Sequence, residues 1–142
     1  MSTNRYLMGI DGGGSKTTAI LADEEGNLLG QGTVGASNFQ VVGHQTAQTA
    51  IVAAMTTAWI EAGMAPQPLR ALCLGLSGVD RPGERAYFHQ WAAEAHPQAR
   101  VVIANDAQLV LAAGTPAGWG LALICGTGSI VYGCSSAGQQ AR

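Results

Sequence analysis

Short apolar runs alternate along this chain with glycine-rich or polar turns, and longer segments repeat apolar side chains at helical spacing. One such stripe contains Ala47, Ile51, Ala54, Met55, Ala58 and Ala62. The pattern predicts strands at 5–11, 17–23, 28–34, 70–76, 101–104, 121–125 and 129–134, and helices at 44–62, 82–95 and 106–113. Three consecutive strands, followed by strands that alternate with helices, predict a mixed α/β sheet with right-handed parallel crossovers.

One edge of this predicted sheet collects the polar candidates. In open α/β sheets, ligands bind beside the carboxyl ends of the parallel strands. The loops expected at that edge are 11–16, 77–82 and 105–106. We therefore expect the side chains of these loops to contribute to one site.

The turn between the first two predicted strands is rich in glycine. It consists of Asp11, Gly12, Gly13, Gly14, Ser15, Lys16 and Thr17. Because glycine has no Cβ, several backbone N–H groups can gather around one anion there. Asp11 could hold a metal ion, and the three side chains after the glycines would add donors. The turn predicts a site for the phosphates of a magnesium nucleotide, with a hairpin that binds nothing as the alternative.

Two better-known glycine motifs do not fit this turn. A Walker loop needs lysine directly after its last glycine, where this chain has Ser15. A dinucleotide-binding fingerprint needs a helix after its glycines. Here Thr17, Thr18 and Ile20 are β-branched and favour a strand. The predicted form is therefore a β-hairpin around the phosphates.

A second glycine turn lies between the last two predicted strands. It contains Gly126, Thr127, Gly128 and Ser129. The small hydroxyl side chains suit phosphate oxygens, because each can donate one hydrogen bond. Two matched hairpins that face each other could hold a triphosphate from both sides, whereas an ordinary tight turn is the alternative interpretation.

Three further loops carry candidate substrate chemistry. Asp106 is either a general base for a sugar hydroxyl or the N-cap of the following helix, and the two roles are compatible. Asn38 offers a donor and an acceptor to a sugar, although a turn or helix cap is favoured locally. Ser77 and Gly78 follow a buried strand, and Gly78 would let a ligand approach the backbone closely. Asp80 is expected to cap the next helix.

Composition argues against several classes of partner and environment. The chain has 142 residues, a net charge of −2 and scattered basic residues, which argues against a nucleic-acid-binding face. No run of about 18 apolar residues occurs, so no membrane span is expected. The short segment before the first strand leaves no room for a signal peptide. Cys73, Cys125 and Cys134 lack metal-ligand spacing and are expected to be buried free thiols in a reducing cytoplasm.

Several motifs together resemble one superfamily. The segment from Gly9 to Thr17 resembles the first phosphate motif of the actin, hexokinase and sugar-kinase superfamily. Within it, the chain is similar to N-acetylglucosamine kinases, which are grouped with the BadF/BadG/BcrA/BcrD-type ATPases. The supporting motifs are 36–38, 74–78, 105–107 and 124–129. They occur in the family's order, and the resemblance covers essentially the whole chain.

The resemblance implies a ribonuclease-H-like, actin-like ATPase fold that uses ATP and Mg²⁺. The implied reaction transfers the γ-phosphate of ATP to the 6-hydroxyl of N-acetylglucosamine. Ser15 and Thr127 match nucleotide-phosphate contacts, and Asp11 matches the acidic residue near magnesium. Asn38 matches a sugar contact, and Asp106 matches the sugar-binding base.

The resemblance also has a departure. The family continues with Gly-Gly-Trp-Gly and Asp-Glu-Gly segments that complete the sugar site, and neither follows the second phosphate motif here. We expect residues 1–118 to form the N-terminal lobe and residues 119–142 to be the truncated start of a second lobe. This piece alone is then expected to have little kinase activity, and the full-length protein to be a cytoplasmic homodimer.

Two alternatives to an N-acetylglucosamine kinase stay open. Glucosamine kinase would share the same motifs with a different amide pocket. An ATPase that activates a reductase is disfavoured, because such family members carry bridging cysteines and no cysteine is predicted in an exposed loop here.

Overall fold

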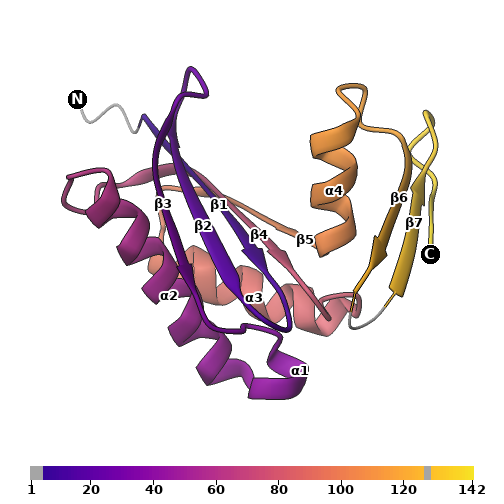
Figure 1. Cartoon of the computed structure of the whole chain (residues 1–142), viewed down its shortest axis with the longest axis horizontal. Helices are drawn as coiled ribbons and strands as arrows, with labels where there is room; N and C mark the ends of the chain where they lie inside the picture. The colour runs from indigo at the N-terminus through magenta and orange to yellow at the C-terminus, as the bar shows by residue number, and fades with distance from the viewer. Residues whose placement is uncertain (1–4, 127–128) are drawn as a thin grey trace.

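The computed structural model describes residues 5–126 and 129–142. Its main feature is a mixed five-stranded sheet in the order β3-β2-β1-β4-β5 (Figure 1). The strands are β1 (Tyr6–Gly12), β2 (Thr17–Asp23), β3 (Leu28–Val34), β4 (Leu69–Leu76) and β5 (Arg100–Ala104). β1 pairs antiparallel with β2 and parallel with β4, and β4 pairs parallel with β5. The predicted mixed α/β sheet is confirmed.

Helices cover the two faces of this sheet. They are α1 (Phe39–Val42), α2 (His44–Glu61), α3 (Pro82–Ala95) and α4 (Asp106–Gly114). α2 and α3 share one core with inward side chains of the strands, such as Ile10 and Leu74. α4 lies on the opposite face, where its Leu109 fills the space beside Gly75 of β4. Since side chains alternate along a strand, Asp11 points to the α4 side, away from Ile10.

The contact between α2 and β3 depends on two glycines. A Cβ atom added to Gly32 would lie 2.1 Å from the backbone oxygen of Ala54, and one added to Gly30 would lie 2.2 Å from that of Ala58. The helix backbone therefore rests directly on the strand. All residues of the predicted α2 stripe are buried except Ala62, which is half-buried.

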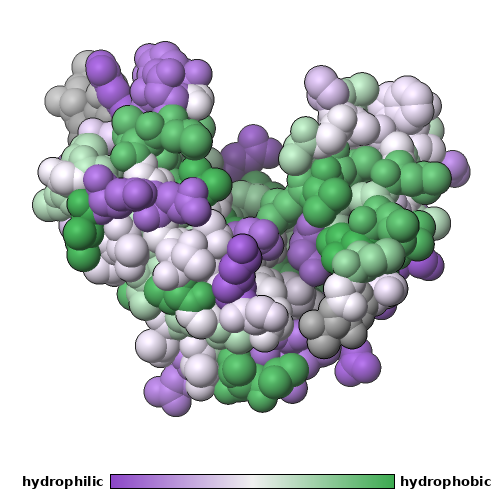
Figure 2. All heavy atoms as spheres, viewed as in Figure 1, coloured by the Kyte–Doolittle hydropathy of each residue, from purple (hydrophilic) through white to green (hydrophobic). Residues whose placement is uncertain are grey.

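A second, smaller sheet follows α4. It consists of β6 (Gly120–Cys125), β7 (Ser129–Cys134) and β8 (Gln140–Ala141). Ala107 and Leu111 of α4 pack with Ala122 and Tyr132 in a separate small core. α4 thus packs with the part of the chain that was assigned to the second lobe, and the boundary at residue 118 stays a prediction. Figure 2 shows the surface deeply notched between the five-stranded sheet and this second unit.

Some local features differ from the sequence analysis. The four-residue helix α1 was not predicted. Cys125 is exposed, whereas Cys73 and Cys134 are half-buried, so the prediction of buried thiols is wrong for Cys125. All three thiols are free, and partial burial raises the pKa of Cys73. Within the described ranges, no helix is both long and apolar enough to cross a membrane.

Candidate active site

The first glycine turn is a hairpin, as predicted. Gly12 of β1 pairs with Thr17 of β2, and no helix follows the glycines. The turn is closed by a hydrogen bond from the Gly13 amide to the Lys16 carbonyl at 3.0 Å. The expected strand–turn–strand form is therefore confirmed, and the exclusion of the two helix-containing glycine motifs holds.

The carbonyl groups of this loop are directed into the protein. The Gly12 carbonyl accepts from the Ser77 amide at 2.9 Å, and the Gly13 carbonyl accepts from the amides of Ser37 and Asn38, both at 3.1 Å. In contrast, the backbone N–H groups of 14–16 have no partner among the described residues, and these residues are exposed. The loop therefore presents N–H groups outward, which is the polarity that attracts an anion.

The three glycines of the loop have different reasons to be small. A Cβ on Gly12 would lie 2.4 Å from Oγ of Ser37, so a larger residue there would require neighbouring side chains to move. Gly14 has no atom within 4 Å of its Cβ position, and Gly13 meets only a backbone oxygen at 3.7 Å. Neither Gly13 nor Gly14 has a positive φ. The chain's own packing and conformation therefore do not explain glycine at 13 and 14, whereas close approach of a ligand would.

Ser15, Lys16 and Thr17 do not share one environment. Ser15 and Lys16 are exposed. Thr17 is fully buried, and its hydroxyl donates to the Gly35 carbonyl at 2.8 Å. The hydroxyl of Thr17 is thus not available to a phosphate, and the prediction that it adds a donor is wrong. Its structural effect is to tie the start of β2 to the loop after β3.

The cap of α4 is Asn105, not Asp106. The Asn105 side chain accepts from the Gln108 amide at 2.8 Å, while the Gln108 side chain accepts from the Asn105 amide at 2.9 Å. This reciprocal capping box leaves Asp106 at the first helical position. The alternative in which Asp106 caps the helix is therefore wrong, and its carboxylate is not consumed by that role.

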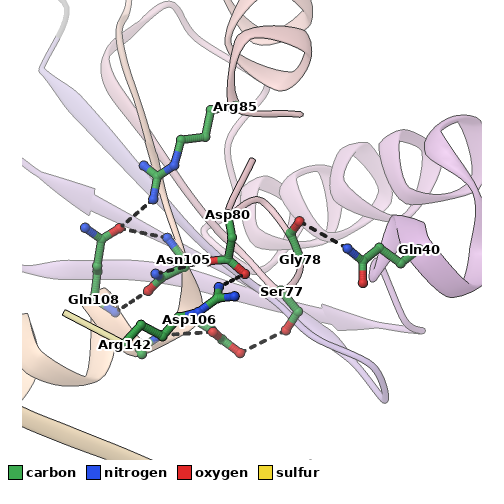
Figure 3. A network of polar contacts seen from close by, with 10 residues as sticks. Gln40, Ser77, Gly78, Asp80, Arg85, Asn105, Asp106, Gln108 and Arg142 are labelled. Carbon is green, nitrogen blue, oxygen red and sulfur yellow. Dashed lines mark hydrogen bonds and ion pairs between the residues drawn. The ribbon is translucent and has the colours of Figure 1, made fainter. Parts of the chain in front are cut away.

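The Asp106 carboxylate is half-buried and held on both oxygens. Oδ2 accepts from the Ser77 hydroxyl at 2.9 Å, and Oδ1 accepts from the Ala107 amide at 3.0 Å (Figure 3). Asp11 lies near enough for its pKa to respond to Asp106. Partial burial raises the pKa of Asp11, the charge of Asp106 raises it further, and Lys16 opposes both. The structure thus brings two acidic side chains and one cation to the carboxyl edge of the sheet.

The remaining predicted substrate residues have mixed outcomes. Oδ1 of Asn38 accepts from the Gln40 amide at 3.1 Å and caps α1, as the local interpretation favoured. Its amide nitrogen has no partner among the described residues, so Asn38 could offer a sugar a donor, besides the second lone pair of Oδ1. Gly78 has φ +88°, and the Gln40 side chain occupies the space beside it. That side chain donates to the Gly78 carbonyl at 3.4 Å.

Asp80 does not cap α3, which corrects another prediction. The N-cap residue is Arg81, and no side chain caps that helix. Asp80 instead forms an ion pair with Arg142 and accepts from Nδ2 of Asn105 at 3.5 Å. These side chains and Tyr132 line a hollow of about 370 Å³ beside the capping box.

Sequence reasoning missed the supports of the Asp106 loop. Arg85 of α3 donates to the Ile103 carbonyl at 3.0 Å and to Oε1 of Gln108 at 3.3 Å. The capping box had a sequence signal, because Asn105 is followed three residues later by Gln108. The Arg85 contacts had none, since they join segments 18 and 23 residues apart.

The second glycine turn is only partly described. Thr127 and Gly128 lie outside the described residues, whereas Gly126 and Ser129 are both exposed. Cys125 pairs with Ser129, so β6 and β7 form the predicted hairpin. In Figure 1, the ends of β6 and β7 that flank this turn lie at the same end of the molecule as the turn between β1 and β2.

A comparison with protein families identifies the group. The model of the BadF/BadG/BcrA/BcrD ATPase family matches residues 8–142. The chain belongs to this family.

Three curated proteins with similar sequences are named as sugar kinases. The N-acetyl-D-glucosamine kinase of Dictyostelium discoideum is 32% identical, and the alignment covers 99% of this chain and 47% of that protein. The N-acetylmuramic acid/N-acetylglucosamine kinase of Clostridium acetobutylicum is 28% identical, and the alignment covers 97% of this chain and 45% of that protein. The glucosamine kinase of Vibrio cholerae is 29% identical, and the alignment covers 87% of this chain and 42% of that protein. The chain thus spans less than half the length of the relatives it matches.

A solved structure shares the fold. The crystal structure of a candidate N-acetylglucosamine kinase from Chromobacterium violaceum superimposes with a TM-score of 0.74 at 31% identity. The match covers 99% of this chain and 48% of that one. The mixed sheet flanked by helices is therefore the actin-like ATPase fold that the resemblance implied.

The face of this BadF/BadG/BcrA/BcrD domain that carries α4 is hollowed. A cavity of about 450 Å³ is lined by Asp11, Lys16, Thr18, Gln31, Cys73 and Leu109, among others. No cluster of three or more His, Cys, Asp or Glu side chains occurs among the described residues. Mg²⁺ needs no such cluster, because it is held in many nucleotide sites by one or two carboxylates, substrate phosphates and water. The hard carboxylate oxygens of Asp11 fit that mode.

Proposed function

We propose that this chain forms the phosphate-binding and catalytic-base part of an ATP-dependent amino-sugar kinase. N-acetylglucosamine is the proposed acceptor, and its 6-hydroxyl is the proposed nucleophile. Ser15, Lys16 and the backbone amides of 14–16 would contact the phosphates from one side. Gly126, Thr127, Gly128 and Ser129 would contact them from the other. Because ATP is the phosphate donor, the proposal places the reaction in the cytoplasm.

One observation carries the proposal: an anion-attracting loop lies beside a carboxylate that its helix does not use as a cap. In the loop, the carbonyls of Gly12 and Gly13 are bonded to amides within the protein, whereas the amides of 14–16 are exposed and have no partner among the described residues. The carboxylate of Asp106 lies close enough to Asp11 for its charge to raise the pKa of Asp11. Asp11 lies near the end of β1, the strand that enters the loop. A sugar hydroxyl between Asp106 and the loop would face a bound γ-phosphate, which is the arrangement that in-line transfer needs.

The proposed step is a simple transfer. The sugar oxygen forms a bond to the γ-phosphorus, the bond from phosphorus to the ADP oxygen breaks, and the hydroxyl proton passes to Asp106. Phosphoryl transfer has a loose transition state, so a weak base suffices and positioning supplies most of the rate. Asp11 would hold Mg²⁺, directly or through water. When bound, this ion would neutralise charge that develops on the phosphates.

The remaining substrate contacts are proposed with narrower roles. Asn38 would donate through its amide nitrogen to an oxygen of the sugar. Gly78 would contribute backbone at the rim of the sugar site, and Ser77 borders the site through Asp106. The full-length protein is proposed to be a homodimer, with residues 119–142 opening a second lobe.

The test is an ADP-release assay on the full-length gene product with a panel of amino sugars. Asp106→Asn should lower kcat for phosphoryl transfer by at least about a hundredfold. The dissociation constant for ATP should stay within about twofold of the parent value. Glu94→Gln is the matched control, because Glu94 is an exposed carboxylate on α3 that accepts a hydrogen bond from Gln90. Full turnover by the Asp106→Asn protein would reject the proposed role of Asp106.

Two other functions remain distinct outcomes of this assay. A preference for glucosamine over N-acetylglucosamine would make the protein a glucosamine kinase, which the Vibrio cholerae relative favours. An ATPase that activates a reductase would release ADP without any sugar and would be far less affected by Asp106→Asn. The exposure of Cys125 removes part of the earlier argument against that role.

A further inference from the structure

Ser77 joins the two halves of the proposed active site. It is the first residue after β4, between the glycine loop and the start of α4. Its backbone amide donates to the Gly12 carbonyl at 2.9 Å, and its hydroxyl donates to Oδ2 of Asp106 at 2.9 Å. One residue therefore fixes both a carbonyl of the phosphate loop and an oxygen of the proposed base. Figure 3 shows the contact with the base.

The orientation of the Asp106 carboxylate depends on this hydroxyl. Asp106 is not the helix cap, so the N-terminal amides of α4 do not fix it through a cap bond. The carboxylate also accepts from the amide of Ala107, the next residue along the chain, which constrains Oδ1 only locally. The Ser77 hydroxyl is the long-range contact, from 29 residues earlier in the sequence.

Ser77 itself has little freedom to move. It follows a strand that is paired on both sides, by β1 and by β5. Gly78, the next residue, adopts a left-handed conformation, and Val79 after it is fully buried. Leu109 of α4 fills the space beside Gly75, which fixes the separation of α4 from β4. The donor and its acceptor are thus carried on two elements whose spacing is set by packing.

We infer that Ser77 is a positioning residue, which orients the Asp106 carboxylate relative to the phosphate loop and does not itself bind the sugar. The inference rests on the proposed kinase function. The hydroxyl proton of Ser77 stays on Ser77 throughout, because it is donated to Asp106 and not transferred. Loss of the hydroxyl would let the carboxylate rotate, while the loop and the sugar contacts of Asn38 stay in place.

This role predicts a split between turnover and binding in the full-length gene product. Ser77→Ala should lower kcat about tenfold to a hundredfold, the size expected when a reacting group is misplaced by about 1 Å. The KM values for ATP and for the sugar should stay within about twofold. Ser77→Thr keeps the hydroxyl and should recover most of kcat. Ser77→Cys keeps the volume of the side chain but supplies only a weak donor, so it should lower kcat as well. It provides the same test if the alanine protein fails to fold.

A double variant tests whether Ser77 acts through Asp106. Ser77→Ala should cause no further loss in an Asp106→Asn background, since the group that it positions is already removed. Ser135→Ala, whose hydroxyl accepts from the Gln139 amide in a distant turn, is the control for loss of a serine hydroxyl.

The competing outcomes are separable. If Ser77 instead bound the sugar, Ser77→Ala would raise the KM for the sugar and leave kcat unchanged. That result would overturn the inference. Unchanged kcat in the alanine and cysteine variants, or no recovery in the threonine variant, would also overturn it. If no amino sugar is phosphorylated, or Asp106→Asn is fully active, the proposed function has failed instead.

Discussion

Replacement of Gly32 by alanine tests the close contact between α2 and the sheet. The added Cβ would lie 2.1 Å from the backbone oxygen of Ala54, whereas real Cβ atoms stay at least 3.0 Å from a neighbour. The helix must therefore retreat by about 0.9 Å, the difference of these two distances. A backbone carbonyl cannot rotate away as a side chain can, so the strain is not relieved locally.

The magnitude follows from two opposing terms. Overpacking of a well-packed contact costs about 1–3 kcal/mol, and the rigid neighbour places Gly32→Ala near the upper limit. Removal of glycine from the unfolded chain returns up to about 1 kcal/mol. We expect a net loss of about 2 kcal/mol, which lowers Tm by about 6 °C for a chain of this size.

The assay is urea and thermal unfolding of the purified chain, followed by circular dichroism. Gly9→Ala is the matched control, because Gly9 also lies within a strand of the same sheet and no atom lies within 4 Å of its Cβ position. That variant should be as stable as the parent or slightly more stable. Equal stability of the two alanine variants would refute the reasoning, since it would mean that α2 does not rest on β3 as described.

Three further predictions concern buried or charged groups at the site. Thr17→Val removes the hydrogen bond to the Gly35 carbonyl and should cost about 1 kcal/mol in urea unfolding. Ser37→Ala should change stability by less than about 0.5 kcal/mol, because the fully buried Ser37 hydroxyl has no partner among the described residues. A loss for Ser37 equal to that for Thr17 would show an unseen partner. The raised pKa of Asp11 means that its ionised form destabilises the fold, so Asp11→Asn should raise Tm at pH 7. That gain should shrink as the pH falls toward the ordinary value of 3.8, and a constant gain would contradict the assigned cause.

The sequence predicted the parts of the site that depend on local signals. The hairpin at Gly13 and the stripe of α2 follow from residue spacing alone, and both are confirmed. The edge that carries Asp106 followed from sheet topology. The spacing of Asn105 and Gln108 is typical of a capping box, so the cap of α4 had a local signal. The adjacent Asp106 is also a favoured cap residue, and it obscured that signal.

Other features could not be predicted, because they depend on contacts between distant segments. From the sequence, the Thr17 hydroxyl suits a hydrogen bond to phosphate. In the fold it donates instead to the carbonyl of Gly35, 18 residues later in the chain. α1 has only four residues, too few for a periodic signal, and it depends on the Asn38 cap and on burial of Phe39. The pairing of Ser77 with Asp106 requires the exact spacing of β4 and α4, which no local pattern contains.

The polarity of the glycine loop explains how a chain with a net charge of −2 could bind a polyphosphate. Attraction would not depend on net charge here, because the exposed amides of 14–16 have no partner among the described residues and clustered N–H groups attract anions. The same edge carries Asp11 and Asp106, whose like charges repel each other and would repel phosphate. A divalent cation between the carboxylates and the phosphates would convert that repulsion into attraction on both sides. The proposed site would therefore pair an anion-attracting loop with acidic side chains, and would favour a metal-bound phosphate over a bare one.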